Sequence, residues 1–345
     1  MAVTIYDVAK KAGVGIGTVS RAINNSPQIN PQTKDRVLRV IQEMKYQPHA
    51  LAQSLARKKS FTIAGIVPYF SNYVYFELLK SVQKAILSHD YGLVLYSVDR
   101  PDQLADTLDR VVADRRSDGV LLISMGLEEK QARKFIETPV PVVLLAHKAA
   151  RLDSFTVANE QAVQCAVEHL ISLGHTRIGM VNGTLTEYPG PERLLGFKTA
   201  LQAKGLPFNE RWLVLCEAEE DEGGFTERAA YRAMQKTFKQ GADLPTAFFV
   251  ASDAQALGLL RAAKEAGVQI PRDLAIVGFD DIKFAKFVGL TTMHQPIAEM
   301  GVMAVERLIQ RIEADSEGGL HQELSATLIV RETCGAHAGF KVEVG

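Results

Sequence analysis

The sequence has few cysteines and no long apolar run, and each of these features excludes a class of protein. Three cysteines occur in 345 residues, Cys165, Cys216 and Cys334, with no Cys-x-x-Cys pair or Cys/His cluster, so neither a disulfide framework nor a zinc site is predicted. No apolar run approaches the ~20 residues of a membrane helix. The N-terminal MAVTIYDVAKKAG carries an Asp and two Lys where a signal peptide has an apolar core. We therefore expect a cytoplasmic protein.

The motifs of common enzyme classes are also missing. The chain has no G-x-S-x-G elbow, no phosphate-binding P-loop and no H-E-x-x-H. The stretch GVGIGTVSR, residues 13–21, alternates three glycines, but a dinucleotide fingerprint requires G-x-G-x-x-G after a strand. Thr18 and Ser20 stand where its third glycine would be. We expect no enzymatic activity, no cofactor and no metal.

Charge is distributed unevenly, although the whole chain has a formal net charge of −1. Residues 1–60 contain ten Lys or Arg and three acids, a net charge of +7. The other 285 residues contain 29 basic and 37 acidic side chains, a net charge of −8. A basic segment on an acidic body is typical of a protein that contacts a polyanion, although a solvated basic face has the same composition.

The first sixty residues carry the pattern of three short helices. Thr4 is a suitable N-cap for the first helix, and Gly13 follows it as a C-cap. A second helix is predicted over 15–24, and a third opens at Asn30-Pro31. Since the glycines lie between two helices, they indicate the turn of a helix-turn-helix, whose second helix can enter a major groove.

The segment TIYDVAKKAGV…TVSRAIN…TKDRVLRVIQEMKYQPHALAQSLARKKS resembles the headpiece of the lactose/galactose repressor (LacI/GalR) family of bacterial transcription regulators, without gaps through residues 3–60. The resemblance implies that residues opening the second helix read base edges: Gly15, Ile16, Gly17 and Arg21. The hydroxyls and amides suited to phosphates belong to Thr4, Thr18, Ser20, Asn24 and Thr33. For each, helix capping or solvation is the alternative. Many members of the family have a polar residue at the position of Gly17. The glycine either lets the backbone approach DNA closely or is a neutral substitution.

Residues 48–57 resemble the hinge helix of the same family. The resemblance implies that paired hinge helices enter the minor groove, where Leu55 would wedge between base pairs and Ala52 would allow close packing of the two helices. A plain linker is the alternative. We therefore divide the chain into a DNA-binding headpiece (1–47), a hinge (48–60) and an effector-binding and dimerisation domain (61–345).

After residue 60 the pattern changes to alternating strands and helices. The apolar segments FTIAGIVPYF, GLVLYSV, GVLLISM, PVVLLAH, RIGMVNG, TAFFVAS and AIVGFDD predict buried strands. Such alternation indicates an α/β fold with parallel sheets covered on both faces. The family resemblance continues here and implies a doubly wound, periplasmic-binding-protein-like domain. We expect its two lobes at about 61–160 plus 291–323 and at about 161–290 plus 324–340.

The resemblance also implies an effector site in the cleft between the lobes. The residues carried over are Arg193, Phe225, Ser252, Asp280 and Gln295, and nearby aromatic and basic candidates are Tyr69, Phe70, Tyr75 and His147. An arginine, a carboxylate and an aromatic wall together suit a polar ring ligand. The alternatives are an inter-lobe ion pair for Arg193 with Asp280, and core packing for the aromatic residues.

One position departs from the family pattern. Many members have an acid where this chain has Ala146, followed by His147 and Lys148. The change weakens the case for a simple sugar, and a phosphorylated sugar, a nucleoside or an anion would suit the two basic residues better. The alternative for His147 is an ordinary exposed or hydrogen-bonded histidine.

These observations predict a DNA-binding transcriptional regulator, a repressor that binds a palindromic operator as a homodimer under control of a small-molecule effector. The tail after residue 331 has no leucine heptad, so we do not expect a tetramer. Three alternatives are a regulator that answers to a phosphorylated carrier protein, a solute-binding protein, and an enzyme. The last two do not account for the +7 headpiece.

Overall fold

The computed structural model describes residues 3–23, 26–46, 59–68, 73–98, 102–114, 116–127, 129–137, 140–186, 188–217, 224–240, 243–314 and 318–336. Most of the predicted hinge lies outside these ranges, as do five predicted site residues: Asn24, Ala52, Leu55, Tyr69 and Phe70. The chain divides into two compact units, Met1–Ser60 and Phe61–Gly345. In the described part of the chain, no helix is long and apolar enough to cross a membrane.

The first unit is a bundle of three helices, α1 (Ile5–Ala12), α2 (Ile16–Ile23) and α3 (Pro31–Glu43). Helix α1 begins where the backbone N–H and the hydroxyl of Thr4 both donate to Asp7 Oδ2, at 2.9 and 2.7 Å. It ends at Gly13, whose φ of 63° favours glycine. The helices enclose a core centred on three fully buried valines, Val8, Val19 and Val37.

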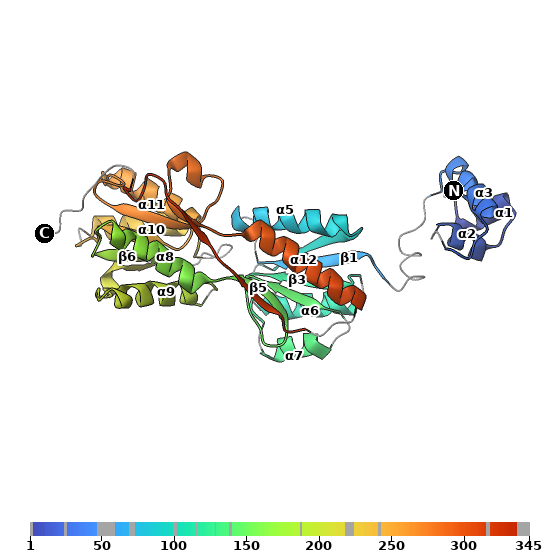
Figure 1. The fold of residues 1–345 in the computed structure, drawn as a ribbon, viewed down its shortest axis with the longest axis horizontal. Helices are drawn as coiled ribbons and strands as arrows, with labels where there is room; N and C mark the ends of the chain where they lie inside the picture. Colours follow the sequence, from blue (N-terminus) through green and yellow to red (C-terminus); the bar gives the residue numbers. More distant parts are fainter. Residues whose placement is uncertain are drawn as a thin grey trace. The chain divides into compact units, whose positions relative to one another are not determined.

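The first lobe of the second unit is a parallel six-stranded sheet in the order β11-β5-β4-β3-β1-β2. Helices α5 and α12 pack together over one face, and α6 and α7 cover the other (Figure 1). The bounds are β1 (Thr62–Val67), α5 (Tyr73–Ser88), β2 (Gly92–Ser97), α6 (Asp102–Ala113), β3 (Gly119–Ile123), α7 (Glu129–Glu137), β4 (Val142–Leu145), β5 (Asp153–Val157), α12 (Ile297–Ala314) and β11 (His321–Leu324).

The second lobe has a six-stranded sheet in the order β12-β10-β9-β8-β6-β7, parallel except for β12. Helices α8 and α9 cover one face, and α10 and α11 the other. The bounds are α8 (Asn159–Ser172), β6 (Ile178–Asn182), α9 (Gly190–Ala203), η1 (Glu210–Trp212), β7 (Leu213–Leu215), α10 (Glu227–Lys239), β8 (Ala247–Val250), α11 (Asp253–Ala266), β9 (Ala275–Asp280), η2 (Ala285–Val288), β10 (Thr292–His294) and β12 (Thr327–Ile329).

The chain crosses between the lobes three times, after β5, after β10 and after β11. The second crossing differs from the expected boundary at 291. Strand β10 pairs with β9 and with β12, so it belongs to the second sheet, and the chain returns to the first lobe between His294 and Ile297. The short strand stays in the second lobe because Thr292 and Met293 are fully buried there.

A buried carboxylate fastens the returning helix α12 to the first sheet. Asp153, at the start of β5, is fully buried. It accepts hydrogen bonds from Arg307 Nη2 at 3.2 Å, Arg311 Nη1 at 2.9 Å and the backbone N–H of Leu320 at 2.9 Å. The bonds satisfy both carboxylate oxygens, as burial of a charge requires. Segments far apart in sequence therefore form one lobe.

Candidate functional site

The exposed face of the headpiece is formed by the start of α2. The backbone carbonyl of Gly15 accepts from the N–H of Thr18 at 2.9 Å, which opens the helix. Ile16 is 40% exposed although it is a large apolar residue, and Gly17 and Arg21 are exposed beside it. The guanidinium of Arg21 folds back on the helix, where its Nε donates to the Gly17 carbonyl at 3.1 Å. An apolar and a cationic side chain are thus presented together on one helix.

Gly17 has no packing role inside the headpiece. A Cβ added there would meet only Arg21 Nη2, at the ordinary contact distance of 3.8 Å. A glycine inside a helix costs about 1 kcal/mol relative to alanine, and no described residue packs against Gly17 closely enough to require a glycine there. The glycine instead bares the helix backbone at this exposed position.

The other predicted headpiece residues differ in their hydrogen bonds and in their exposure. The Thr4 hydroxyl donates to Asp7 Oδ2 at the start of α1. Thr18, Ser20 and Thr33 are partly exposed.

A pocket lies between the two lobes of the second unit, at the carboxyl ends of their strands, where ligands of parallel sheets bind. Six predicted effector residues line it: Tyr75, Arg193, Phe225, Ser252, Asp280 and Gln295. The sequence reasoning did not assign the other lining residues: Val74, Ser124, Ala146, Val157, Asn159, Tyr188 and Pro189. Tyr69 and Phe70 lie outside the described residues.

The backbone that forms the pocket is unusual at three strand ends. Ser124 follows β3, Ala146 follows β4 and Asp280 ends β9, and their φ angles are 51°, 55° and 124°. Positive φ is uncommon for residues other than glycine, and such conformations cluster at functional sites. Here each one lies at the wall of the same pocket.

The cation of the pocket is Arg193 of α9, which is only 5% exposed. Its Nε donates to Asn159 Oδ1 at 3.1 Å, and its Nη1 donates to the Ala251 carbonyl. The guanidinium carbon stands 3.9 Å from the centre of the Phe279 ring, a cation–π distance. Burial lowers the pKa of Arg193, and the nearby Asp280 carboxylate opposes that shift. Among the described residues Arg193 has no salt bridge, and Nη2 has no hydrogen-bond partner.

The anion of the pocket is Asp280, at the end of β9. Its Oδ1 accepts from Gln295 Nε2 at 2.5 Å, and its Oδ2 accepts from the backbone N–H of Asp253 at 3.4 Å. Burial raises the pKa of Asp280 to about 6, against the opposing effect of Arg193 and these hydrogen bonds. Asp280 is therefore ionised near neutral pH but takes up a proton in mildly acidic solution.

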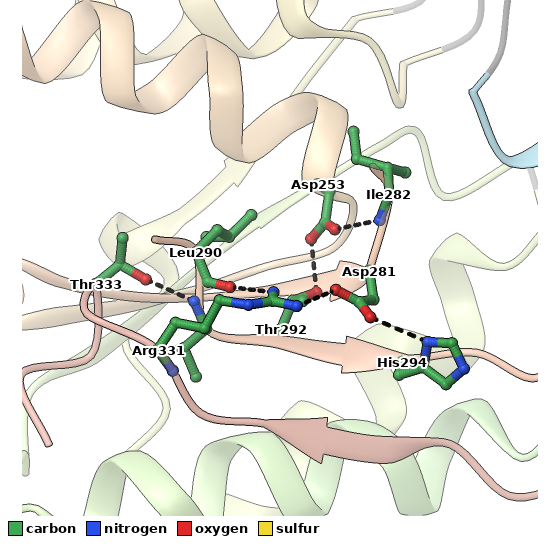
Figure 2. Close-up of polar contacts among 9 residues, drawn as sticks. Asp253, Asp281, Ile282, Leu290, Thr292, His294, Arg331 and Thr333 are labelled. Carbon is green, nitrogen blue, oxygen red and sulfur yellow. Dashed lines mark hydrogen bonds and ion pairs between the residues drawn. The ribbon is translucent and has the colours of Figure 1, made fainter. Parts of the chain in front are cut away.

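A second buried carboxyl group belongs to Asp253, whose backbone N–H donates to Asp280. Asp253 begins α11 and accepts from the Thr292 hydroxyl at 2.6 Å and from the Ile282 N–H at 2.9 Å (Figure 2). Burial raises the pKa of Asp253 well above its usual range, and the neighbouring Asp280 adds to this shift. Asp253 ties the first turn of α11 to the segment that follows β9, which sequence reasoning did not anticipate.

Asn159 and Tyr188 form the wall beside Arg193. Asn159 Nδ2 donates to the Tyr188 hydroxyl at 3.0 Å and to Glu192 Oε2 at 3.0 Å, while its oxygen accepts from Arg193. Burial raises the pKa of Tyr188, which stays a neutral phenol. In the sequence, Tyr188 stands directly before Pro189-Gly190-Pro191, which marks a turn at the start of α9. The sequence does not show that this turn faces the pocket.

The two basic residues expected to favour an anionic ligand do not line the pocket. The ring of His147 packs on Tyr188 with centroids 5.1 Å apart, its Nδ1 donates to the Lys148 carbonyl at 2.9 Å, and burial lowers its pKa. Lys148 forms an ion pair with Glu323. Neither side chain therefore supplies a cation to the lining of the pocket.

No group of three or more His, Cys, Asp or Glu in the described ranges has an arrangement suited to a metal ion. The polar side chains of the pocket carry one guanidinium, one carboxylate, two amides, two serine hydroxyls and two tyrosine hydroxyls, which are groups of a binding site for a polar molecule.

Two family models match the chain. One is described as bacterial regulatory proteins of the lacI family and matches residues 4–49. The other is described as a periplasmic binding protein-like domain and matches residues 167–334.

Relatives and solved structures match nearly the whole chain. It is 34% identical to catabolite control protein A of Priestia megaterium, covering 92% of this chain and 94% of that protein. It is 32% identical to the HTH-type transcriptional repressor PurR of Edwardsiella ictaluri, with 96% of each covered. The lac repressor dimer bound to operator and the anti-inducer ONPF superimposes with a TM-score of 0.85 at 25% identity, covering 97% of this chain and 99% of that one. A complex of the regulator CelR with cellobiose superimposes with a TM-score of 0.71 at 29% identity. The match covers 96% of this chain and 99% of that one.

The raised pKa of Asp280 predicts a specific pH dependence of stability. Between about pH 4 and pH 6 the folded protein holds a proton on Asp280 that the unfolded chain has lost, so ionisation of this group lowers the free energy of unfolding as the pH rises. Asp280→Asn cannot ionise. Relative to the wild type, we expect it to gain stability from pH 4 to pH 7 by on the order of 2 kcal/mol, measured by urea unfolding.

Asp273 provides the opposite control. Its hydrogen bonds from Arg272 and from the Gln269 N–H lower its pKa, so Asp273→Asn is expected to lose stability relative to the wild type as the pH rises. A flat difference between Asp280→Asn and the wild type from pH 4 to pH 7 would show that Asp280 titrates like an exposed aspartate.

Proposed function

The chain belongs to the lacI family of bacterial regulatory proteins, and from that premise we propose that it binds a palindromic operator as a homodimer under control of an uncharged polar effector. It is a DNA-binding repressor regulated by an effector bound in its periplasmic-binding-protein-like domain, and its relatives are repressors rather than enzymes. The observation that carries the proposal is the pocket of Arg193 and Asp280, in a chain whose headpiece presents the start of α2.

The exposed start of α2 supports a role in reading DNA. Ile16 can pack on a thymine methyl, and Arg21 can make the bidentate contact to guanine, once it leaves the Gly17 carbonyl. The bare backbone at Gly17 allows close approach to the groove. The charge of +7 on residues 1–60 supplies the attraction to phosphates that does not depend on sequence. Insertion of Leu55 and packing of Ala52 at the hinge stay predictions.

Arg21→Ala tests direct reading by α2. With DNA selected by the full-length wild type from a random duplex library, we expect the variant to lose about 1–3 kcal/mol of specific binding free energy. The affinity of the variant for unrelated duplex should change little, because the variant loses only one of the ten basic side chains of residues 1–60 that attract phosphates. The measurement is fluorescence anisotropy at fixed salt concentration. Arg39→Ala on α3 is the matched control, and an equal loss on both DNAs by Arg21→Ala would show that Arg21 does not read bases.

The charge of the pocket indicates the class of effector. Its lining contains one guanidinium and one carboxylate, so an uncharged ligand leaves the site balanced. Arg193 Nη2 offers hydrogen-bond donors, Asp280 offers acceptors, and Phe225 offers an aromatic wall. A sugar or nucleoside has hydroxyls that act both as donors and as acceptors. The relative CelR has been solved with cellobiose, which is consistent with this class.

Thermal unfolding of the full-length protein tests the effector class. The panel contains D-ribose, cellobiose, nucleosides and the corresponding sugar phosphates. A ligand at 100 times its dissociation constant adds about 2.7 kcal/mol of stability, so we expect at least one uncharged compound to raise the midpoint. The shift should vanish in Asp280→Ala and persist in Asp273→Ala, which removes an exposed carboxylate of the same lobe.

The outcomes separate the alternatives. A shift produced only by sugar phosphates would contradict the uncharged class. A shift that survives in Asp280→Ala would place the effector elsewhere. No shift with any compound, together with intact DNA binding, would favour a protein co-regulator such as a phosphorylated carrier protein.

An exposed apolar surface of the second unit supports the proposed homodimer. It is formed by α5 and η2 with the residue before it, and includes Phe76, Phe284, Phe287 and Val288. Tyr73 of α5 and Phe284 stack edge to face at 5.5 Å, and Lys283 pairs with Glu77 of α5 at 2.7 Å, which joins its two halves. Phe76 is 63% and Phe287 76% exposed. Contiguous apolar patches on soluble proteins mark interaction sites.

Phe287→Glu is expected to shift the protein from dimer to monomer in analytical ultracentrifugation, because it places a charge in that surface. Leu195→Glu, at an exposed leucine of α9, is the matched control and should remain dimeric. A Phe287→Glu variant that sediments as the wild type would exclude this surface as the interface.

A further inference from the structure

The segment Asp281–Thr291 connects two places that matter for the proposed function. It begins directly after Asp280, whose carboxylate lines the pocket. It contains η2, whose Phe287 and Val288 are exposed on the proposed dimer surface. It ends at the buried Thr291, just before β10. The carboxylate of Asp280 is held directly by Gln295 and the N–H of Asp253, and the backbone that follows Asp280 is held by the contacts of this segment.

Residues 331–333, which follow β12, fasten that segment through their backbone and side chains. The N–H groups of Glu332 and Thr333 donate to the Gly289 carbonyl at 2.9 and 3.1 Å. The N–H of Arg331 donates to the Thr291 hydroxyl at 2.8 Å, and the N–H of Thr291 donates to the Thr333 hydroxyl at 2.9 Å. These bonds hold the far end of the segment, around Gly289–Thr291.

The side chain of Arg331 reaches back to the near end. Its Nη1 donates to the Leu290 carbonyl at 2.7 Å, and its Nη2 donates to Asp281 Oδ1 at 2.7 Å (Figure 2). One planar guanidinium thus spans both ends of the segment. The side chains of Arg331 and Asp281 are both 19% exposed, so the ion pair is partly shielded from water and stronger than a surface pair.

The turn held in this way is strained. Asp280 and Asp281 have φ angles of 124° and 60°. The first is rare for any residue other than glycine, and the second lies in the left-handed region, which aspartate enters more readily than most residues. Three contacts surround the turn: Arg331 on Asp281 Oδ1, His294 Nδ1 on Asp281 Oδ2 at 3.1 Å, and the Ile282 N–H on Asp253 at 2.9 Å. Among them, Arg331 alone links the turn to the tail of the chain.

We infer that Arg331 is a positioning residue: through Asp281 it fixes the turn that presents the Asp280 carboxylate to the pocket. Arg331 does not line the pocket itself. The inference rests on the proposed role of Asp280 in effector binding, but the geometry of the turn can be tested without an effector.

The test is the titration of Asp280 in the full-length protein, followed by carbon NMR of carboxyl-labelled aspartate. The resonance is assigned from its loss in Asp280→Asn. The charged groups that face Asp280 are Arg193 and Asp253. In Arg331→Met we expect the midpoint to fall by about one pH unit or more from its value near 6, because a released turn exposes the carboxyl group to water.

The sign of the change discriminates between mechanisms. If Arg331 acted on Asp280 only through its charge, its removal would raise the midpoint, since a cation favours the carboxylate. A raised or unchanged midpoint would therefore overturn the inference. Arg331→Lys keeps the charge but cannot span both Asp281 and the Leu290 carbonyl, so we expect a smaller fall in the same direction. It provides the test if Arg331→Met does not fold.

Thr333→Val is the matched control. It removes the hydroxyl that donates to the Ile276 carbonyl at 3.0 Å and accepts from the Thr291 N–H, so it weakens the same tail segment without touching Asp281. We expect lower stability and an unchanged Asp280 midpoint. An equal midpoint change in Thr333→Val would show that Arg331 has a structural role only. Loss of effector binding in Asp280→Ala tests the proposed function separately.

Discussion

Burial of one guanidinium opposite one carboxylate, at the junction of two lobes, is the constraint on which the pocket depends. Arg193 and Asp280 come from the same lobe, and both are nearly inaccessible to solvent. Neither charge is cancelled by direct contact, since Arg193 donates to neutral oxygens and Asp280 accepts from an amide and a backbone N–H. Charges buried in this way need polar partners, and a bound polar ligand is the natural source of the remaining ones.

This arrangement relates effector binding to DNA binding through the chain topology. Three crossings join the lobes, and the pocket has walls from both, with Ser124 and Ala146 from the first and Arg193 and Asp280 from the second. A ligand that contacts both walls favours one angle between the lobes. A regulator requires two sites whose occupancy favours different states of the same molecule, and we propose that the exposed α2 is the second site.

Much of this organisation follows from local sequence patterns. The helix-turn-helix and the seven apolar strands are found where the patterns place them, because strong periodicity and turn residues determine them. The effector residues were expected only from the resemblance to the family, and six of them line the pocket. Strands β5, β7, β10, β11 and β12 were not predicted, since each has only three to five residues and gains stability from pairing with neighbours distant in sequence. The return to the first lobe was misplaced for the same reason.

The contacts that the sequence did not indicate are long-range. Asn159 reaches Arg193 across 34 residues, and Arg331 reaches Asp281 across 50. No spacing rule connects such pairs. The same is true of the preference for an uncharged effector, because it depends on which charged side chains the fold brings to the lining of the pocket. These side chains acquire their roles only when the two sheets and the C-terminal segment are assembled.

We propose that occupancy of this pocket changes the affinity of the protein for DNA. The most direct measurement is a titration of the compound that stabilises the full-length protein, performed once on free protein and once on protein saturated with its selected DNA. Linkage requires the DNA to change affinity for the compound by the same factor by which the compound changes affinity for DNA. We predict a factor of about 5–150, typical of coupled sites. Equal affinity of the compound for free and DNA-bound protein would contradict the account.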